Sequence, residues 1–282
     1  MEIIVAKTAG FCFGVDKAIQ KVNKAIGKEI IYTYGPIIHN QQVVKTFESK
    51  GVQVINNLDE LDHLPLGTII IRSHGAGKAD IDVMKSKGFK IIDATCPYVK
   101  RIHKIVEESS RQGNKIIIIG SPLHPEVVGI KGWSSQDVYI IDTIEDIDNL
   151  LITQEDTFCL VTQTTFNFFM YKEIVNKLQK NEIHVMIYET ICSATEERQL
   201  EAIDLSKVAT KMIVIGGKHS SNTQKLYHIC KSQCEDTFLI ETAEDLVLNV
   251  FDDNDIIGIT AGASTPKNII EEVILNVRRT KF

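Results

Sequence analysis

Three cysteines of this 282-residue chain, Cys12, Cys96 and Cys192, share one local setting. Each follows a short apolar, β-branched run and precedes residues with helical spacing, so each is predicted to lie where a strand passes into a helix. A thiol at a helix N-terminus meets unpaired backbone N–H groups and the positive end of the dipole, which favour the thiolate that binds metals. Three such thiolates, far apart in the sequence, indicate a metal site that is assembled by the fold.

The spacing of these cysteines leaves an iron-sulfur cluster, a structural zinc ion and plain core packing as alternatives, because the chain has no Cys-x-x-Cys pair. The local context favours a metal. Gly10 and Gly14 flank Cys12 and permit close approach to the backbone, and Pro97 follows Cys96 at a position where the first helical turn accepts proline. The other cysteines are predicted to pack in the core: Cys159, Cys230 and Cys234.

Histidines form a second set of candidates. His39, His74 and His124 each follow a predicted strand or turn in a comparable place. A single such histidine is ordinarily a hydrogen-bonded polar residue. Three convergent imidazoles suit a polyanion such as a diphosphate, because they donate hydrogen bonds and take up positive charge near neutral pH.

Two loops that follow strands combine hydroxyl groups with a helix start. They span residues 216–222, which include Ser220, Ser221 and Asn222, and residues 260–266, which include Ser264. Free N–H groups at a helix start bind anions, although N-capping alone explains such residues equally well. Neither loop has the G-x-x-x-x-G-K-S/T spacing of a nucleotide-binding loop, and no G-x-G-x-x-G follows a strand.

Glu126, which follows His124 and Pro125, is the best candidate proton donor. A carboxyl group beside a bound anion and away from bulk water has a raised pKa, so we expect Glu126 to hold a proton at pH 7. The alternative is an acidic residue that complements the first turn of a helix. Thr164 ends another predicted strand and is a candidate to orient a substrate hydroxyl or to cap a helix.

Short β-branched runs alternate with amphipathic stretches along the whole chain, which predicts an α/β fold with parallel sheets. Cuts near Cys96 and Cys192 divide it into three small α/β modules: 14–96, 97–191, and 192–282 together with 1–13. The opening strand is left to pair with either end. The expected strands are Glu2 to Val5, Ile30 to Thr33, Val52 to Ile55, Thr68 to Arg72, Phe89 to Asp93, Lys115 to Ile119, Val138 to Ile141, Phe158 to Thr162, His184 to Tyr188, Lys211 to Ile215, Phe238 to Ile240 and Ile256 to Thr260.

The composition, 44% hydrophobic and 24% charged, indicates a globular protein with a substantial core. A net charge of −6 argues against nucleic acid or an anionic membrane as the main partner. The first residues lack the features of a signal peptide and no apolar run is long enough for a membrane span, so a cytoplasmic location is expected. In such a compartment cysteines act as ligands or core residues and do not form a disulfide framework.

The motifs together resemble one family over essentially the whole chain, the 4-hydroxy-3-methylbut-2-enyl diphosphate reductase (LytB/IspH) family. They are Gly10-Phe11-Cys12-Phe13-Gly14-Val15, Ile38-His39-Asn40, Ser73-His74-Gly75, Asp93-Ala94-Thr95-Cys96-Pro97, His124-Pro125-Glu126-Val127, Thr162-Gln163-Thr164-Thr165, Ile191-Cys192-Ser193-Ala194-Thr195, Ser220-Ser221-Asn222 and Thr260-Ala261-Gly262-Ala263-Ser264.

The resemblance implies the last step of the non-mevalonate (MEP) isoprenoid pathway, in which an allylic diphosphate loses its hydroxyl group to give isopentenyl and dimethylallyl diphosphate. It implies three lobes in a pseudo-threefold, cloverleaf arrangement around a 4Fe-4S cluster. The cluster is held by Cys12, Cys96 and Cys192, and its fourth iron is open to the substrate hydroxyl.

By the same resemblance, Glu126 supplies the proton, with Thr164 and His124 in its hydrogen-bond network. A ferredoxin or flavodoxin is the implied electron donor. The implied diphosphate-binding residues are His39, His74, His124, Thr164, Ser220, Ser221, Asn222 and Ser264.

Two alternatives from other classes remain. A non-catalytic metal protein that senses a phosphorylated metabolite would keep the cysteines and the anion loops without a need for Glu126. A thiol redox enzyme would use Cys230 and Cys234.

Overall fold

The computed structural model describes residues 1–150, 156–180, 183–247 and 250–279 and divides the chain into two compact units. Unit 1 consists of Met1–Asp16, His39–Val44 and Ser193–Phe282, and unit 2 of Lys17–Ile38 and Lys45–Cys192. The described strands form three parallel four-stranded sheets, two of them in unit 2 and one in unit 1.

The first sheet of unit 2 has the strand order β3-β2-β4-β5. Its register places Ile31 of β2 beside Val52 of β3 and Thr68 of β4. Helix α3 and the 3-10 helix η1 pack on one face of this sheet through Met84 and Leu61. The elements of this part of the chain are α1 (Phe13–Ala25), β2 (Ile31–Tyr34), α2 (Gln41–Glu48), β3 (Val52–Ile55), η1 (Leu58–His63), β4 (Thr68–Ile71), α3 (Lys78–Ser86) and β5 (Lys90–Asp93).

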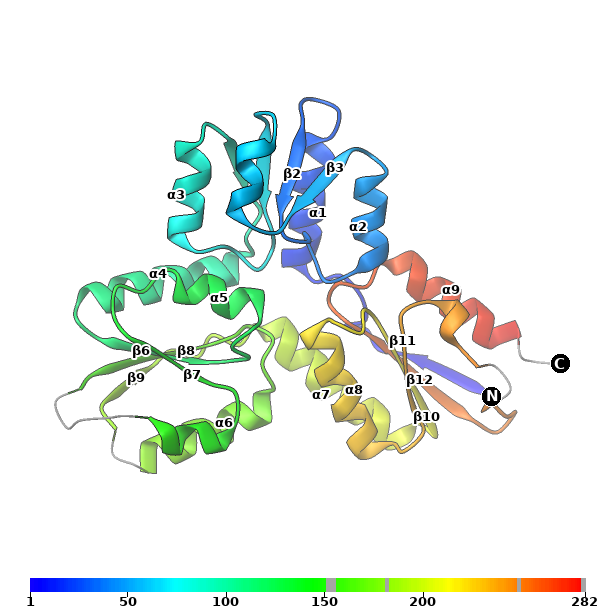
Figure 1. The fold of residues 1–282 in the computed structure, drawn as a ribbon. Helices are drawn as coiled ribbons and strands as arrows, with labels where there is room; N and C mark the ends of the chain where they lie inside the picture. The colour runs from blue at the N-terminus through cyan, green and yellow to red at the C-terminus, as the bar shows by residue number, and fades with distance from the viewer. Residues whose placement is uncertain (151–155, 181–182, 248–249, 280–282) are drawn as a thin grey trace. The chain divides into compact units, whose positions relative to one another are not determined.

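The second sheet of unit 2 has the order β7-β6-β8-β9. Helices α4 and α5 cover one of its faces and α6 the other (Figure 1). The apolar run Ile116–Ile119 of β6 is fully buried because side chains of both faces lie under helices. The elements are α4 (Pro97–Arg111), β6 (Lys115–Ile119), α5 (Pro125–Lys131), β7 (Val138–Ile141), η2 (Ile144–Asn149), β8 (Phe158–Thr162), α6 (Phe168–Lys180) and β9 (Val185–Ile187).

The sheet of unit 1 has the order β1-β12-β10-β11. The opening strand therefore pairs with the C-terminal part of the chain, with Glu2 beside Ile256 and Val5 beside Ile259. Helices α7 and α8 pack on one face and α9 on the other. The elements are β1 (Glu2–Val5), α7 (Ser193–Val208), β10 (Lys211–Ile215), α8 (Ser221–Gln233), β11 (Thr237–Ile240), η3 (Ala243–Asp245), β12 (Ile256–Ala261) and α9 (Lys267–Arg279).

All three sheets repeat one topology. When the strands of each sheet are numbered along its repeat, with β1 as the fourth strand of the third sheet, every sheet has the order 2-1-3-4. The 3-10 helices η1, η2 and η3 occupy matching places before the third strand, and each begins with a capping box, at Asn57, Thr143 and Thr242. The α/β fold of three parallel modules predicted from the sequence is confirmed, whereas the module boundaries and the arrangement around a cluster stay predictions.

The apolar strands that the sequence indicated are present with small shifts at their ends. Val52–Ile55, Lys115–Ile119, Val138–Ile141, Phe158–Thr162 and Lys211–Ile215 have the predicted limits. No helix in the described part of the chain combines the length and the apolar character that a membrane crossing requires.

Candidate functional site

Each of the three candidate cysteines lies in the connection after the fourth strand of a sheet, β1, β5 or β9, and immediately precedes the next helix. Their backbone N–H groups make equivalent hydrogen bonds: Cys12 donates to Ala263 O (3.3 Å), Cys96 to Ser73 O (2.9 Å) and Cys192 to Thr164 O (3.1 Å). In every case the acceptor lies just beyond the third strand of the same sheet. The fold thus builds the same cysteine position three times.

These cysteines differ from the other three in exposure. Cys12, Cys96 and Cys192 are partly exposed and free of disulfides, whereas the others lie inside the cores. Burial raises the pKa of Cys230 to about 11 and also raises that of Cys159, so both thiols are protonated and unreactive near neutral pH. Accessible thiols in three equivalent places fit an iron-sulfur cluster, which cysteine thiolates hold.

The remaining candidates follow the first and third strands of the sheets. In the order 2-1-3-4, the chain leaves the first strand toward one edge of the sheet and continues from the third strand toward the other edge. Between the carboxyl ends of these two strands, such a topological switch point forms a crevice in which ligands bind. In unit 2, His124 and Thr164 form a pair of candidates at such a switch point, and in unit 1 Ser220 and Ser264 do. His39 and His74 follow β2 and β4 and belong to unit 1 and unit 2, respectively.

In unit 2, His124 is the N-cap of α5, and its Nδ1 accepts a hydrogen bond from Glu126 N at 3.2 Å. Pro125 at the first helical turn fits this start, since the missing N–H is not needed there. The acceptor role of Nδ1 leaves Nε2 as the nitrogen available for donation. The ring lies edge to face against His74, with centroids 5.4 Å apart.

Glu126 is 2% exposed and is held by Thr164 through both carboxylate oxygens. Oε1 accepts a hydrogen bond from Thr164 N at 2.6 Å, and Oε2 lies 2.8 Å from Thr164 Oγ1. Because Thr164 lies in the loop after β8 and Glu126 lies at the start of α5, the two switch-point loops of this sheet are joined through this carboxyl group. Glu126 lies in the first turn of α5, where an acidic residue complements the helix start, but its side chain is fixed by tertiary contacts.

In unit 1, Ser220 is the N-cap of α8 and accepts from Thr223 N, and Ser264 Oγ donates to His39 O at 3.1 Å. Asn222 is 6% exposed, and its Nδ2 has no hydrogen-bond partner within the described ranges. A buried amide N–H without a partner is costly unless a ligand accepts from it. Unit 1 thus contains an unused donor beside a helix start.

The sequence did not single out Arg198, which the structure places at the centre of unit 1. Its guanidinium is 3% exposed and donates to Ala261 O (2.5 Å) and to Gly10 O (2.9 Å). Arg198 thereby fixes the loops that lead to Cys12 and Ser264. No sequence signal marked it, because a charged residue in a helix is ordinarily exposed.

His103 and Trp133 were also missed. His103 lies inside α4, is 6% exposed and stacks on Trp133 with ring centroids 5.0 Å apart. Trp133 is the single tryptophan of the chain, which was the one available signal.

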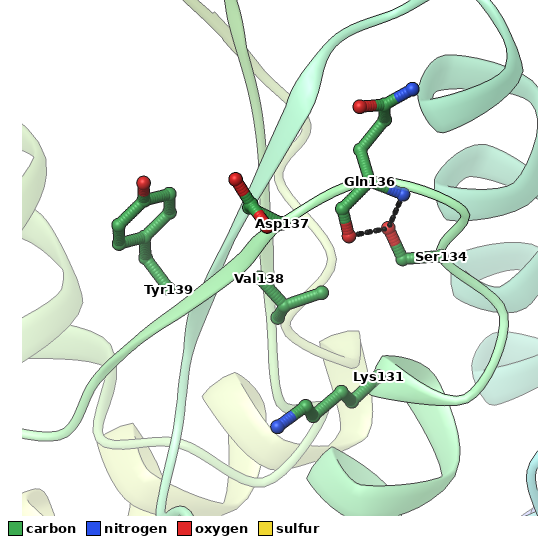
Figure 2. Close-up of a pocket in the computed structure, with 6 residues that line it drawn as sticks. All are labelled: Lys131, Ser134, Gln136, Asp137, Val138 and Tyr139. Atoms are coloured by element: carbon green, nitrogen blue, oxygen red, sulfur yellow. Dashed lines mark hydrogen bonds between the residues drawn. The ribbon is translucent and has the colours of Figure 1, made fainter.

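The structure also has an open surface depression of about 470 Å³, shown in Figure 2. Ser134 and Gln136 are hydrogen bonded on its rim. None of its lining residues is a candidate from the sequence, so it is not part of this site. They are Lys131, Ser134, Gln136, Asp137, Val138 and Tyr139.

Comparison with known proteins agrees with this geometry. The model of the family described as LytB protein matches residues 3–278. The chain belongs to the LytB protein family. The family and the oxidoreductase class predicted from the sequence are therefore confirmed, and members of this family are iron-sulfur enzymes.

Curated relatives match over nearly their full lengths. A "4-hydroxy-3-methylbut-2-enyl diphosphate reductase" of Caldanaerobacter subterraneus subsp. tengcongensis is 45% identical over 100% of this chain and 98% of its own length. A protein of the same name from Clostridioides difficile is 46% identical over 97% of this chain and 98% of its own.

Two solved structures are also similar. One is titled "Structure of (E)-4-Hydroxy-3-methyl-but-2-enyl Diphosphate Reductase, the Terminal Enzyme of the Non-Mevalonate Pathway" and matches with 38% identity and a TM-score of 0.71 over 99% of both chains. The other, the E-1-hydroxy-2-methyl-but-2-enyl-4-diphosphate reductase from Plasmodium falciparum, matches with 29% identity and a TM-score of 0.92 over 97% of this chain and 87% of that one.

Proposed function

We propose that this chain reduces 4-hydroxy-3-methylbut-2-enyl diphosphate to isopentenyl and dimethylallyl diphosphate, the last step of the non-mevalonate pathway. The observation that carries the proposal is the buried Glu126, held by Thr164 beside His124 in a chain of the LytB family. The reaction consumes two electrons and two protons. The allylic C–O bond breaks, the oxygen leaves as water with one proton, and the other proton is added to carbon.

Cys12, Cys96 and Cys192 are the proposed ligands of a 4Fe-4S cluster, which leaves one iron without a cysteine. When bound, the cluster supplies the two electrons and a Lewis-acidic iron for the hydroxyl group of the substrate. The support for these ligands is their equivalent position after the fourth strand of each sheet and their partial exposure.

Glu126 supplies the proton in this proposal, and its hydrogen bonds distinguish the two carboxyl oxygens. Oε1 accepts from Thr164 N and Oε2 accepts from Thr164 Oγ1 at 2.8 Å. A hydroxyl can also accept, whereas a backbone N–H cannot, so Oε2 is the oxygen that we propose to carry the proton once the Thr164 hydroxyl turns to accept. From Oε2 the proton passes through the Thr164 hydroxyl to the departing oxygen. His124 keeps the carboxyl group in place because its Nδ1 accepts from Glu126 N.

The proposed diphosphate-binding groups are the imidazoles of His39, His74 and His124 and the polar groups of Ser220, Ser221, Asn222, Ser264 and Thr164. Imidazoles donate hydrogen bonds to anionic oxygens and gain charge in their presence. The unpartnered Nδ2 of Asn222 gives this assignment its structural support. The proposed electron donor is a protein of the ferredoxin or flavodoxin type.

Anaerobic purification followed by a turnover assay tests the proposal. We expect about four irons and four sulfides per chain. We also expect a visible band that bleaches with dithionite and formation of both C5 diphosphates from the allylic substrate. Zinc in place of iron, or a loaded protein that leaves the substrate intact, would contradict the proposal and favour the sensor alternative.

A further inference from the structure

The loop that contains His74 is held by an indole from the neighbouring sheet of unit 2. Trp133, two residues beyond the end of α5, donates from Nε1 to Ala76 O at 3.0 Å. A half-buried indole N–H needs one acceptor, and here that acceptor lies two residues beyond His74. The bond fixes the backbone of the His74 loop relative to α5.

His103 of α4 holds the same loop on another side. Its ring stacks on Trp133 at an interplanar angle of 16°. A Cβ atom on Gly75 would lie 2.5 Å from His103 Cε1, and Gly75 has a φ of +79°. Only glycine therefore fits between His74 and this ring. Burial lowers the pKa of His103 to about 4, so the stacked ring is uncharged at neutral pH.

Glycines bring the backbones of the two segments into direct contact. A Cβ atom on Gly132 would lie 2.6 Å from Gly77 Cα, and Lys78 N donates to Gly132 O at 3.3 Å. A Cβ atom on Gly129 of α5 would make an ordinary van der Waals contact, at 3.5 Å, with the backbone of Gly75 and Ala76. The end of α5 thus packs on the His74 loop, while the start of the same helix presents His124 and Glu126.

We propose that Trp133 and His103 form a clamp that positions His74 opposite His124 for anion binding. The clamp residues themselves do not touch the substrate. They affect anion binding because the two imidazoles, with centroids 5.4 Å apart, bind one anion together only while their separation is fixed. The proposal rests on the proposed function for the assignment of these histidines to the diphosphate.

Trp133→Phe and His103→Gln test the clamp in the anaerobically prepared holoenzyme. The first removes the N–H donor and keeps an aromatic ring, and the second removes the stacked ring and keeps a planar polar group. We expect the KM of the allylic diphosphate and the Ki of inorganic diphosphate to rise by about tenfold, with kcat changed by less than about twofold. Wild-type KM and Ki in both variants would overturn the proposal.

A matched control separates positioning from general destabilisation. Ile174→Val shortens a fully buried side chain on the opposite face of the same sheet. Its melting temperature should fall by a few degrees without a change in KM or Ki. If its KM and Ki rise as much as those of the clamp variants, the effect is one of stability and the clamp is wrong.

A fluorescence measurement needs no clamp variant. Trp133 is the only tryptophan, so its emission reports on the clamp. We expect inorganic diphosphate to change this emission saturably in the wild type and to leave it unchanged in His74→Ala. An unchanged wild-type emission at saturating diphosphate would count against the clamp.

Calorimetric binding of inorganic diphosphate distinguishes this proposal from the proposed function. If the wild-type holoprotein binds diphosphate without turnover, the reductase function is wrong and the Kd values of the variants still decide the clamp. If it neither turns over nor binds diphosphate, both proposals are overturned.

Discussion

Glu126 occupies a position that combines burial with a complete set of hydrogen bonds. Thr164 engages both carboxylate oxygens, and the backbone N–H of Glu126 is satisfied by His124. A glutamine in this place can accept from Thr164 N and donate to Thr164 Oγ1, so it preserves the shape of the site without a transferable proton.

Glu126→Gln is therefore expected to lower kcat by about 10²- to 10⁴-fold, the usual contribution of a general acid. The iron content and the Ki of inorganic diphosphate should stay at wild-type values. Steady-state turnover with a chemical reductant measures kcat. Metal analysis measures the iron content, and inhibition kinetics measure the Ki. Glu108→Gln, an exposed change on α4, is the control. A Glu126→Gln variant with wild-type kcat would remove this residue from the mechanism.

His103 predicts a pH dependence of stability. Its pKa in the folded protein is lowered to about 4 from 6.5 by burial, so below pH 6.5 the unfolded chain binds a proton that the folded chain does not. The free energy of unfolding should fall as the pH drops from 6.5 to 4, by about 1.4 kcal/mol per pH unit from this group. It is unaffected by this group above pH 6.5.

Urea unfolding of the wild type and of His103→Gln at several pH values measures this effect. The difference between the two slopes isolates His103, because all other titrating groups are shared. Parallel curves between pH 4 and 6.5 would show that His103 does not titrate as its burial requires.

At the scale of elements, the candidate site residues lie at the ends of helices and strands, whereas the interiors of these elements form the packed cores. Cys230 lies inside α8 and is fully buried in the core that this helix forms with α7 and β10. Cys234 caps the same helix, and its Sγ lies 3.4 Å from Thr210 O. Neither thiol is placed for redox exchange, since burial raises the pKa of both.

Changing both Cys230 and Cys234 to Ala should leave kcat within about twofold and lower the free energy of unfolding by about 1–2 kcal/mol through lost packing. Turnover and urea unfolding check the two parts. Cys159→Ala is a control for loss of a buried thiol in unit 2. Loss of turnover on changing only the α8 pair would favour the thiol redox alternative.

At the scale of the molecule, the sheet of unit 1 depends on a strand from the far end of the chain. Among the described strands β1 pairs with β12 alone, and Glu201 of α7 accepts hydrogen bonds from Lys7 N and Thr8 N just beyond it. These contacts hold the segment that leads to Cys12. Without β1 the edge of β12 would be open to pairing with other chains.

Deletion of residues 2–5 is expected to increase aggregation and to accelerate amide exchange in β12, while β6 and β8 of unit 2 keep their protection. Hydrogen exchange of the soluble fraction and sedimentation measure these effects. Equal loss of protection in both units would show that they unfold together.

The sequence predicted these strands best where β-branched runs are bounded by polar residues, as at Lys115–Ile119. It erred by one or two residues at edge strands such as β9, where only one neighbour fixes the ends and where His184 and Tyr188 were included. Periodicity shows that a strand exists without showing its neighbour, so the grouping of 1–13 with 192–282 did not identify β12 as the partner of β1.

The same contrast between local pattern and tertiary contact applies to the residues of the candidate site. Residues at strand ends, such as Cys96 and His124, were predictable from their place in the local pattern. Trp133, His103 and Arg198 were not, because their roles depend on carbonyl groups and rings far away in the sequence.

The pairing of β1 with β12 also determines when this protein can finish folding. Glu2 emerges first during synthesis, whereas its partner Ile256 follows 254 residues later. At ribosomal speeds this delay is on the order of tens of seconds, during which both sheets of unit 2 are already complete in sequence. The strand that leads to Cys12 therefore lacks its partner β12 until translation is almost over, so the contacts that place this thiol form late in synthesis.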